Sequence, residues 1–296
     1  MKKIVVLSGG GAKGMIQSEC LNQLEQRGEL KDIDLYLGTS VGSINASILA
    51  SGVCSARDLS GLYKDMAYKV FRKRSKFFNK LRPPIYDRQN FINCFNNIVG
   101  QDFLISQVRT PLIVTSVDMT NKKVVFFKSY KDKYKYNKLL DVVCKSFAAP
   151  YYFGEIDDDR AEVKYADGGM GVDNLPISEA ILEMFKNGWQ CDQVQFIIVG
   201  CGYSQVPEDY KSNKGASTAH QLSEYMDPLD GGLAREMSRN WQLGYLQLLC
   251  GFMPNVHMKY YDCLLPEEMD GMDKLEYLDL YHDKGNVMSR SPLINI

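Results

Sequence analysis

The stretch Ile4–Gly14, IVVLSGGGAKG, decides the fold, because a β-branched run gives way to glycines and then to a helical pattern. Four apolar residues in a row before a turn are typical of a parallel strand buried on both faces. Helical spacing of apolar residues continues to Arg27, and Gly28 predicts the end of that helix. A second strand at 34–38 and a second helix at 41–50 complete a parallel βαβ unit, whose crossover is almost always right-handed.

The composition predicts a folded globular protein without metal or disulfide staples. The chain has 296 residues, of which 45% are hydrophobic and 24% charged, and its net charge of −1 argues against a nucleic-acid partner. Its 8 cysteines show no CxxC pair, so we expect reduced thiols and no metal site. The apolar run at residues 4–7 is too short for a secretory signal, and no stretch approaches the roughly 20 apolar residues of a membrane span. We therefore expect a cytoplasmic protein, with any membrane contact peripheral at the inner membrane face.

The rest of the chain continues the α/β pattern without repeats or low-complexity linkers. Further helices are predicted at residues 55–71, 88–98, 139–149, 176–187 and 233–250. Further strands are predicted at 112–118 and 124–127, as a hairpin, at 163–166 and 194–199, and at 260–265 as an edge strand. This organisation favours one domain over 1–296, with a motif-bearing core at 1–202, irregular insertions at about 70–100 and a less regular region at 203–296.

The glycine-rich turn Gly9–Gly14 satisfies the G-x-G-x-x-G template of dinucleotide sites. That interpretation also requires an acidic residue at the end of the second strand, where this chain has Gly38-Thr39-Ser40. A Walker A phosphate loop is disfavoured because Lys13 precedes the closing glycine. What remains is a turn whose amide groups point at a negative charge near a helix amino terminus, or a turn that only permits tight packing.

A second motif, Gly38-Thr39-Ser40-Val41-Gly42, lies at the next strand-to-helix turn. In a G-x-S-x-G elbow the glycines Gly38 and Gly42 remove the Cβ atoms that would clash in a strained turn, which makes Ser40 a candidate nucleophile. The alternative is an ordinary N-cap serine. Because successive parallel strands lie close together, the Gly9–Gly14 turn and Ser40 should meet at the carboxyl edge of the sheet.

A nucleophilic serine needs a base, and the sequence offers two kinds. His220, His257 and His282 permit a Ser-Asp-His triad, although none of the three lies beside a motif. The stronger candidate is Asp167, which follows a short strand and precedes Gly168 and Gly169; the alternative is a turn aspartate. A free aspartate has a pKa near 3.9, so we expect partial burial to raise it in a working base.

Together these motifs resemble the patatin-like phospholipase family, in order, from residue 4 to about 202. The resemblance rests on the glycine loop, the elbow about 25 residues later and the distant D-G-G, with weaker echoes at 146–153 and 173–176. It implies a three-layer α/β/α sandwich around a mainly parallel central sheet. It also implies a serine lipid acyl hydrolase that cleaves phospholipid esters through an acyl-enzyme, without calcium or a cofactor.

Carried over residue by residue, the resemblance places a catalytic dyad on Ser40 and Asp167. The oxyanion loop falls on Gly9, Gly10, Gly11, Lys13 and Gly14. Two alternatives remain open for the same fold: a transacylase that passes the acyl group to another alcohol, and a non-catalytic or signal-gated lipid-binding effector.

A basic stretch at 69–82 predicts contact with an anionic membrane surface. The residues proposed for this contact are Arg72, Lys73, Arg74, Lys76, Phe77 and Phe78. The alternative is a solvated charged face whose phenylalanines point into the core.

Overall fold

The computed structural model describes residues 1–73, 84–170, 174–204 and 233–296, with side chains from residue 236 onward in the last range. The helices there are α1 (Gly14–Gln26), α2 (Val41–Ser51), α3 (Ala56–Val70), α5 (Arg88–Ile98), α6 (Leu139–Ser146), α7 (Ile177–Lys186), α9 (Leu233–Phe252) and α10 (Leu278–Arg290). The strands are β1 (Lys2–Leu7), β2 (Leu35–Thr39), β3 (Leu112–Asp118), β4 (Lys123–Lys128), β5 (Ile156–Asp158), β6 (Val163–Asp167), β7 (Val194–Val199), β8 (Val256–Tyr261) and β9 (Ile294–Asn295).

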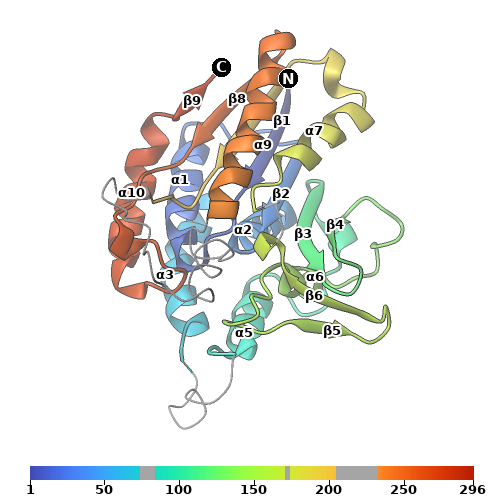
Figure 1. The fold of residues 1–296 in the computed structure, drawn as a ribbon, viewed down its shortest axis with the longest axis vertical. Helices are drawn as coiled ribbons and strands as arrows, with labels where there is room; N and C mark the ends of the chain where they lie inside the picture. The colour runs from blue at the N-terminus through green and yellow to red at the C-terminus, as the bar shows by residue number, and fades with distance from the viewer. Residues whose placement is uncertain (74–83, 171–173, 205–232) are drawn as a thin grey trace, which may run out of the picture.

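These strands form one sheet in the order β5-β6-β3-β2-β1-β7-β8-β9, with β4 paired to β3 (Figure 1). The five strands from β3 to β8 in that order run parallel, while β4, β5, β6 and β9 add antiparallel pairs towards the two edges. The first βαβ unit is confirmed, since β1 and β2 pair in parallel around α1.

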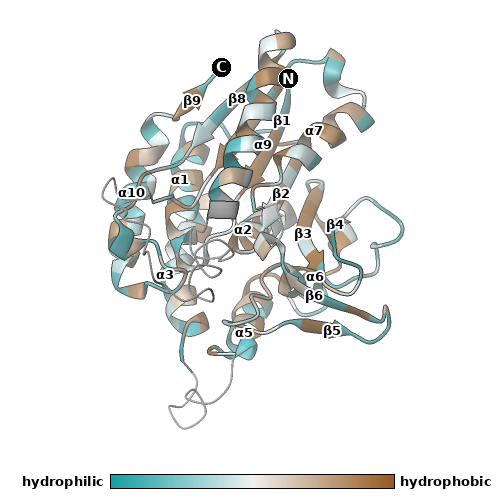
Figure 2. Ribbon diagram, viewed as in Figure 1, coloured by the Kyte–Doolittle hydropathy of each residue, from teal (hydrophilic) through white to brown (hydrophobic). Residues whose placement is uncertain are grey.

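The sheet is covered on both faces, as continuous apolar strands require. Along β1, Val5 and Leu7 pack into one core with α1, α2 and α3, whereas Ile4 and Val6 pack into a second core with α7 and α9. Figure 2 shows β1 and β3 largely in brown between these helical layers. The expected three-layer α/β/α sandwich around a mainly parallel centre is therefore confirmed.

The carboxyl-terminal strand differs from its prediction. We expected an edge strand at 260–265, but β8 spans Val256–Tyr261 and lies inside the sheet, parallel to β7 and bordered by β9. Its first half alternates buried Val256 and Met258 with half-exposed His257 and Lys259. Because these two polar side chains interrupt the apolar run, the sequence lacks the continuous apolar pattern that is typical of an interior strand.

A charge cluster ties β4 to α7. Lys128 Nζ donates to Glu183 Oε1 at 2.7 Å and also binds Glu179, while Tyr130 Oη donates to Glu183 Oε2 at 2.6 Å. Burial alone would raise the pKa of Glu183, but the bonds from Lys128 and Tyr130 outweigh it and lower the pKa from 4.5 to about 2. The folded state therefore prefers the charged carboxylate.

This cluster predicts a pH-dependent stability. Because the folded pKa of Glu183 lies below its unfolded value, its contribution is full above pH 4.5 and is lost as the pH falls towards about 2. In urea unfolding, Glu183→Gln should cost stability near neutral pH, and the gap to wild type should close in acid. The exposed Glu268→Gln serves as control; a gap that stays constant with pH would contradict the assignment.

Candidate active site

Two strands that end head to head bring the predicted nucleophile and base together. Parallel β2 pairs with β3 up to Thr39 opposite Thr115, and antiparallel β6 pairs with the same strand down to Asp167 opposite Ser116. Thr115 and Ser116 are neighbours in β3. Strand β4 pairs with one side of β3 from Ile113 to Asp118, so β2 and β6 share the other side. The residue after β2 and the last residue of β6 therefore meet.

Those two residues are Ser40 and Asp167, and their side chains are hydrogen-bonded. Ser40 Oγ donates to Asp167 Oδ2 at 2.8 Å, although 127 positions separate the residues in the chain. Both are buried, with Ser40 4% exposed and Asp167 fully covered. The amide of Gly169 donates to Asp167 Oδ1 at 2.7 Å, which fixes the carboxylate and leaves Oδ2 turned to the serine.

The elbow has the strained geometry that its glycines predicted. Ser40 has φ 54° and ψ −124°, a conformation that L-residues rarely adopt. A Cβ on Gly42 would lie 2.4 Å from Leu7 O, and one on Gly38 would lie 2.3 Å from Gly42 O. The Ser40 amide donates to Ser146 Oγ at 2.9 Å at the end of α6, so a second element supports the turn. The side chain of Ser40 does not cap its own helix.

The glycine loop lies directly against this serine. A Cβ on Gly9 would come 3.0 Å from Ser40 Cβ, and Gly11 lines the same pocket as Ser40. In the described part of the chain, neither Gly10 nor Gly11 has a hydrogen-bond acceptor for its amide. These two amides can hold a negatively charged oxygen beside Ser40.

The amides of the other predicted loop members already donate hydrogen bonds within the chain. The amide of Gly9 donates to Asn174 O at 3.2 Å, that of Lys13 to Gly10 O at 3.2 Å, and that of Gly14 to Gly11 O. The Lys13 side chain is fully buried and forms an ion pair with Asp270, so its ammonium group is not available to bind an oxyanion beside Ser40. Lys13 and Gly14 therefore shape the loop without facing the serine.

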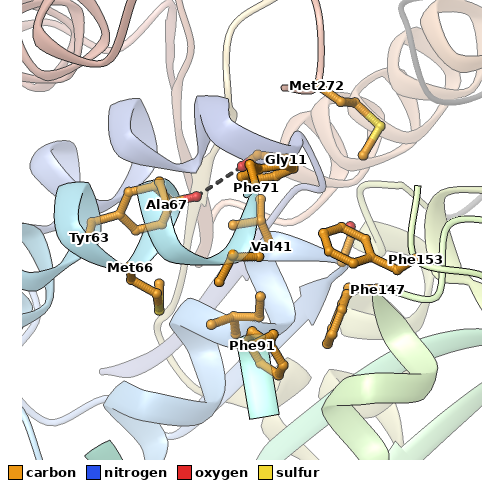
Figure 3. A pocket seen from close by; sticks show the side chains of 13 residues that line it. Gly11, Val41, Tyr63, Met66, Ala67, Phe71, Phe91, Phe147, Phe153 and Met272 are labelled. Atoms are coloured by element: carbon orange, nitrogen blue, oxygen red, sulfur yellow. Dashed lines mark hydrogen bonds between the residues drawn. The ribbon is translucent and has the colours of Figure 1, made fainter. Parts of the chain in front are cut away.

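An apolar pocket opens beside Ser40 (Figure 3). It holds about 450 Å³ of space, including its open mouth. The lining is almost entirely hydrophobic: Gly11, Ser40, Val41, Ile44, Tyr63, Met66, Ala67, Val70, Phe71, Phe91, Phe147, Phe153 and Met272. Such a pocket excludes water and suits a hydrocarbon chain next to a nucleophile.

Tyr63 and Met272 also brace the glycine loop. Tyr63 Oη donates to Gly11 O at 2.9 Å, and burial raises the pKa of Tyr63, so the hydroxyl keeps its proton. The amide of Ala12 donates to Met272 O at 2.7 Å. No short motif marks Tyr63, Met272 or Asp270 in the sequence, because each reaches the loop from a distant element. Ser146 and Asn174 lie in the segments 146–153 and 173–176, whose resemblance to the family is weaker.

The remaining predicted residues lie elsewhere. His257 Nε2 is 3.3 Å from Gln193 Oε1, and His282 Nε2 is 3.3 Å from Glu19 Oε2, so neither contacts Ser40. His220 lies outside the described residues. In the basic stretch, Arg72 and Lys73 are exposed. Arg74, Lys76, Phe77 and Phe78 lie outside the described residues.

No helix in the described ranges has both the length and the apolar character that a membrane crossing requires.

Comparison with known proteins places this site in a family. The family model described as Patatin-like phospholipase matches residues 5–181. A "cGAMP-activated phospholipase" of Escherichia coli (strain TW11681) is 27% identical over 299 residues, covering 94% of this chain and 79% of that protein. A protein of the same description from Vibrio cholerae is 28% identical over 208 residues, covering 62% of this chain and 58% of that protein.

Among solved structures, VipD from Legionella pneumophila aligns with a TM-score of 0.45 and 13% identity, over 96% of this chain and 67% of that chain. The assignment rests on the family model, which matches more than half of the residues. The chain belongs to the patatin-like phospholipase family.

Proposed function

We propose that this protein is a serine lipid acyl hydrolase that cleaves carboxyl esters of phospholipids, in the manner of a phospholipase A or lysophospholipase. The observation that carries the proposal is the 2.8 Å hydrogen bond from Ser40 Oγ to Asp167 Oδ2 at an apolar pocket. Family membership supports a lipid ester as the substrate class. The proposed reaction uses no calcium and no cofactor, and we propose that residues 1–296 work as one catalytic domain.

The first half of the proposed mechanism forms an acyl-enzyme. Ser40 Oγ attacks the ester carbonyl carbon while its proton passes to Asp167 Oδ2, and the carbonyl oxygen becomes an oxyanion held by the Gly10 and Gly11 amides. Collapse of the tetrahedral intermediate breaks the ester bond. The leaving alcohol takes the proton from Asp167, and the acyl group stays on Ser40.

The second half releases the fatty acid. A water molecule gives a proton to Asp167 as its oxygen attacks the acyl carbon, and the same two amides hold the second oxyanion. Ser40 then leaves as the free hydroxyl after taking that proton back from Asp167. If another alcohol replaces water in this step, the enzyme is a transacylase, so the acceptor alone distinguishes the two functions.

Pocket length should determine chain-length preference. Ala67 lines the pocket from α3, and Ala67→Phe would fill the space that distal methylenes occupy. Each buried methylene contributes about 0.8 kcal/mol, so losing a few should reduce kcat/KM for long acyl chains about 10- to 100-fold relative to acetyl or butyryl esters. Leu62→Phe, on the exposed side of the same helix, should leave the ratio unchanged. Equal losses for short and long esters would contradict the acyl-pocket assignment.

The proposed function is tested by product analysis on two substrates, a short p-nitrophenyl ester and mixed phospholipid vesicles. Release of free fatty acid supports a hydrolase, whereas acyl transfer to an added alcohol supports a transacylase. Each reaction is run with and without cGAMP, because two relatives are described as cGAMP-activated. Activity only with the nucleotide would assign the signal-gated function. Vesicle co-sedimentation in the same samples tests the proposed peripheral contact at the inner membrane face.

A further inference from the structure

Helix α9 is apolar on two opposite sides. Its inner side packs Leu243, Leu246 and Cys250 into the core between the sheet and α7. Its outer side carries five exposed apolar residues, which we call the α9 stripe: Met237, Trp241, Tyr245, Leu248 and Phe252. At about 100° per residue these five side chains fall within roughly 80° of the helix circumference. A surface helix normally has one apolar side, which faces the core, so a second apolar side on α9 indicates a second contact.

The stripe faces outward in the part of the molecule that Figure 1 shows in front of the sheet, beside α7. Trp241 is 61% exposed, Leu248 59% and Phe252 78%. No charged residue occurs between residues 240 and 253. Surface helices rarely present so many large apolar side chains together unless something binds there.

Two glycines border the stripe, and no contact within the described part of the chain requires a glycine at either position. Gly244 and Gly251 interrupt α9, where each costs roughly 0.5–1 kcal/mol relative to alanine. Neither has a positive φ, and a Cβ at either position would meet nothing within 4 Å outside its own helix in the described part of the chain. Missing side chains on an outward face let the backbone of another helix approach closely.

The pattern distinguishes a protein partner from a lipid surface. Helices that lie in a membrane interface carry many lysines and arginines on their polar face, and residues 240–253 carry none. Glycines at two outward positions reduce the apolar area available to lipid, but they provide sockets for side chains of a neighbouring helix. The stripe is therefore built for helix-to-helix packing.

The stripe is also complementary to itself when a second copy runs antiparallel. A two-fold axis between Gly244 and Tyr245 brings the Tyr245 rings of the two copies side by side, with Gly244 of each copy at the opposite margin of the contact. The same axis sets Trp241 opposite Leu248. Met237 then lies opposite Phe252, and every member of the stripe has a partner.

We propose that this protein forms a two-fold symmetric homodimer through the antiparallel α9 stripe. The five exposed side chains offer on the order of 600 Å² per copy, approaching the roughly 800 Å² that each partner buries in a standard interface. An isologous interface of this kind requires no other protein.

The test is sedimentation velocity of the full chain over a range of concentrations. Wild type should be dimeric, while Trp241→Lys and Leu248→Glu should each raise the dissociation constant at least about 100-fold. Val287→Glu on α10, 61% exposed, is the matched control and should remain dimeric. Gly244→Leu should also yield monomers, although leucine favours the helix and therefore folding.

Mixing the two charged variants tests the register. An equimolar mixture of Trp241→Lys and Leu248→Glu pairs Lys with Glu on one side of the axis and keeps the native Trp–Leu contact on the other, so dimers should return. The proposal is overturned if wild type is monomeric throughout, if Leu248→Glu remains dimeric, or if the mixture stays monomeric. Monomeric wild type that pellets with anionic phospholipid vesicles, while Leu248→Glu stays in the supernatant, would instead assign the stripe to lipid.

Discussion

Ser40→Ala and Asp167→Asn are each expected to lower kcat/KM for ester hydrolysis by at least about 10³-fold. The alanine removes the only oxygen that can carry the acyl group in the proposed mechanism. In the wild type, Ser40 Oγ donates a 2.8 Å hydrogen bond to Asp167 Oδ2; the asparagine keeps the shape of Asp167 but cannot accept this proton. Because the two groups act in one step, the kcat/KM of the double variant should lie within a small factor of that of the less active single variant.

Initial rates with a p-nitrophenyl ester and with phospholipid vesicles measure this effect. Ser47→Ala is the matched control, since Ser47 is a buried serine two turns along α2 whose hydroxyl has no hydrogen-bond partner in the described part of the chain. It should retain near wild-type activity. Circular dichroism must show that all variants are folded. Substantial turnover by folded Asp167→Asn would require another base and would overturn the dyad.

Lys13→Met is expected to destabilise the protein by about 3–5 kcal/mol, because it leaves the carboxylate of Asp270 buried without its counter-ion. Lys13 is fully covered and Asp270 is 8% exposed, so water does not replace the lost partner. The pair also joins the glycine loop to the segment that carries Met272, whose carbonyl accepts the Ala12 amide. The variant should therefore lose kcat on esters as well as stability, while KM changes little.

A double variant separates the charge from the packing. Lys13→Met with Asp270→Leu replaces the buried pair by apolar groups, which is often neutral for stability, so most of the lost free energy of unfolding should return. Lys2→Met, which breaks the partly exposed Lys2–Asp34 pair, should cost at most about 1 kcal/mol. Urea unfolding measures all three. A loss in Lys13→Met no larger than in Lys2→Met would contradict the role of the buried pair.

Local sequence was sufficient to predict the central part of the fold and to propose the two candidate catalytic residues. The βαβ start could be predicted because its strand, turn and helix signals are adjacent in the chain. Ser40 and Asp167 could be proposed because the steric demands of an elbow and of a strand end require glycine beside them. Figure 3 shows what this reasoning could not supply, the apolar pocket assembled from several helices.

The rest depended on partners far away in sequence. That β6 runs antiparallel and ends against β2 follows from its register on β3, for which β6 itself carries no signal. The function of Lys13 depends on Asp270, 257 positions later. The interior position of β8 was obscured by His257 and Lys259, whose side chains are half-exposed.

The ion pair between Lys13 of the glycine loop and Asp270 constrains when the loop can be held in place during biosynthesis. Lys13 of the glycine loop is synthesised 257 positions before Asp270, so the loop leaves the ribosome well before the segment that holds it. Domains acquire their long-range contacts only when both partners are available. A nascent chain therefore carries Ser40 beside an unbraced glycine loop until the segment with Asp270 and Met272 has been synthesised.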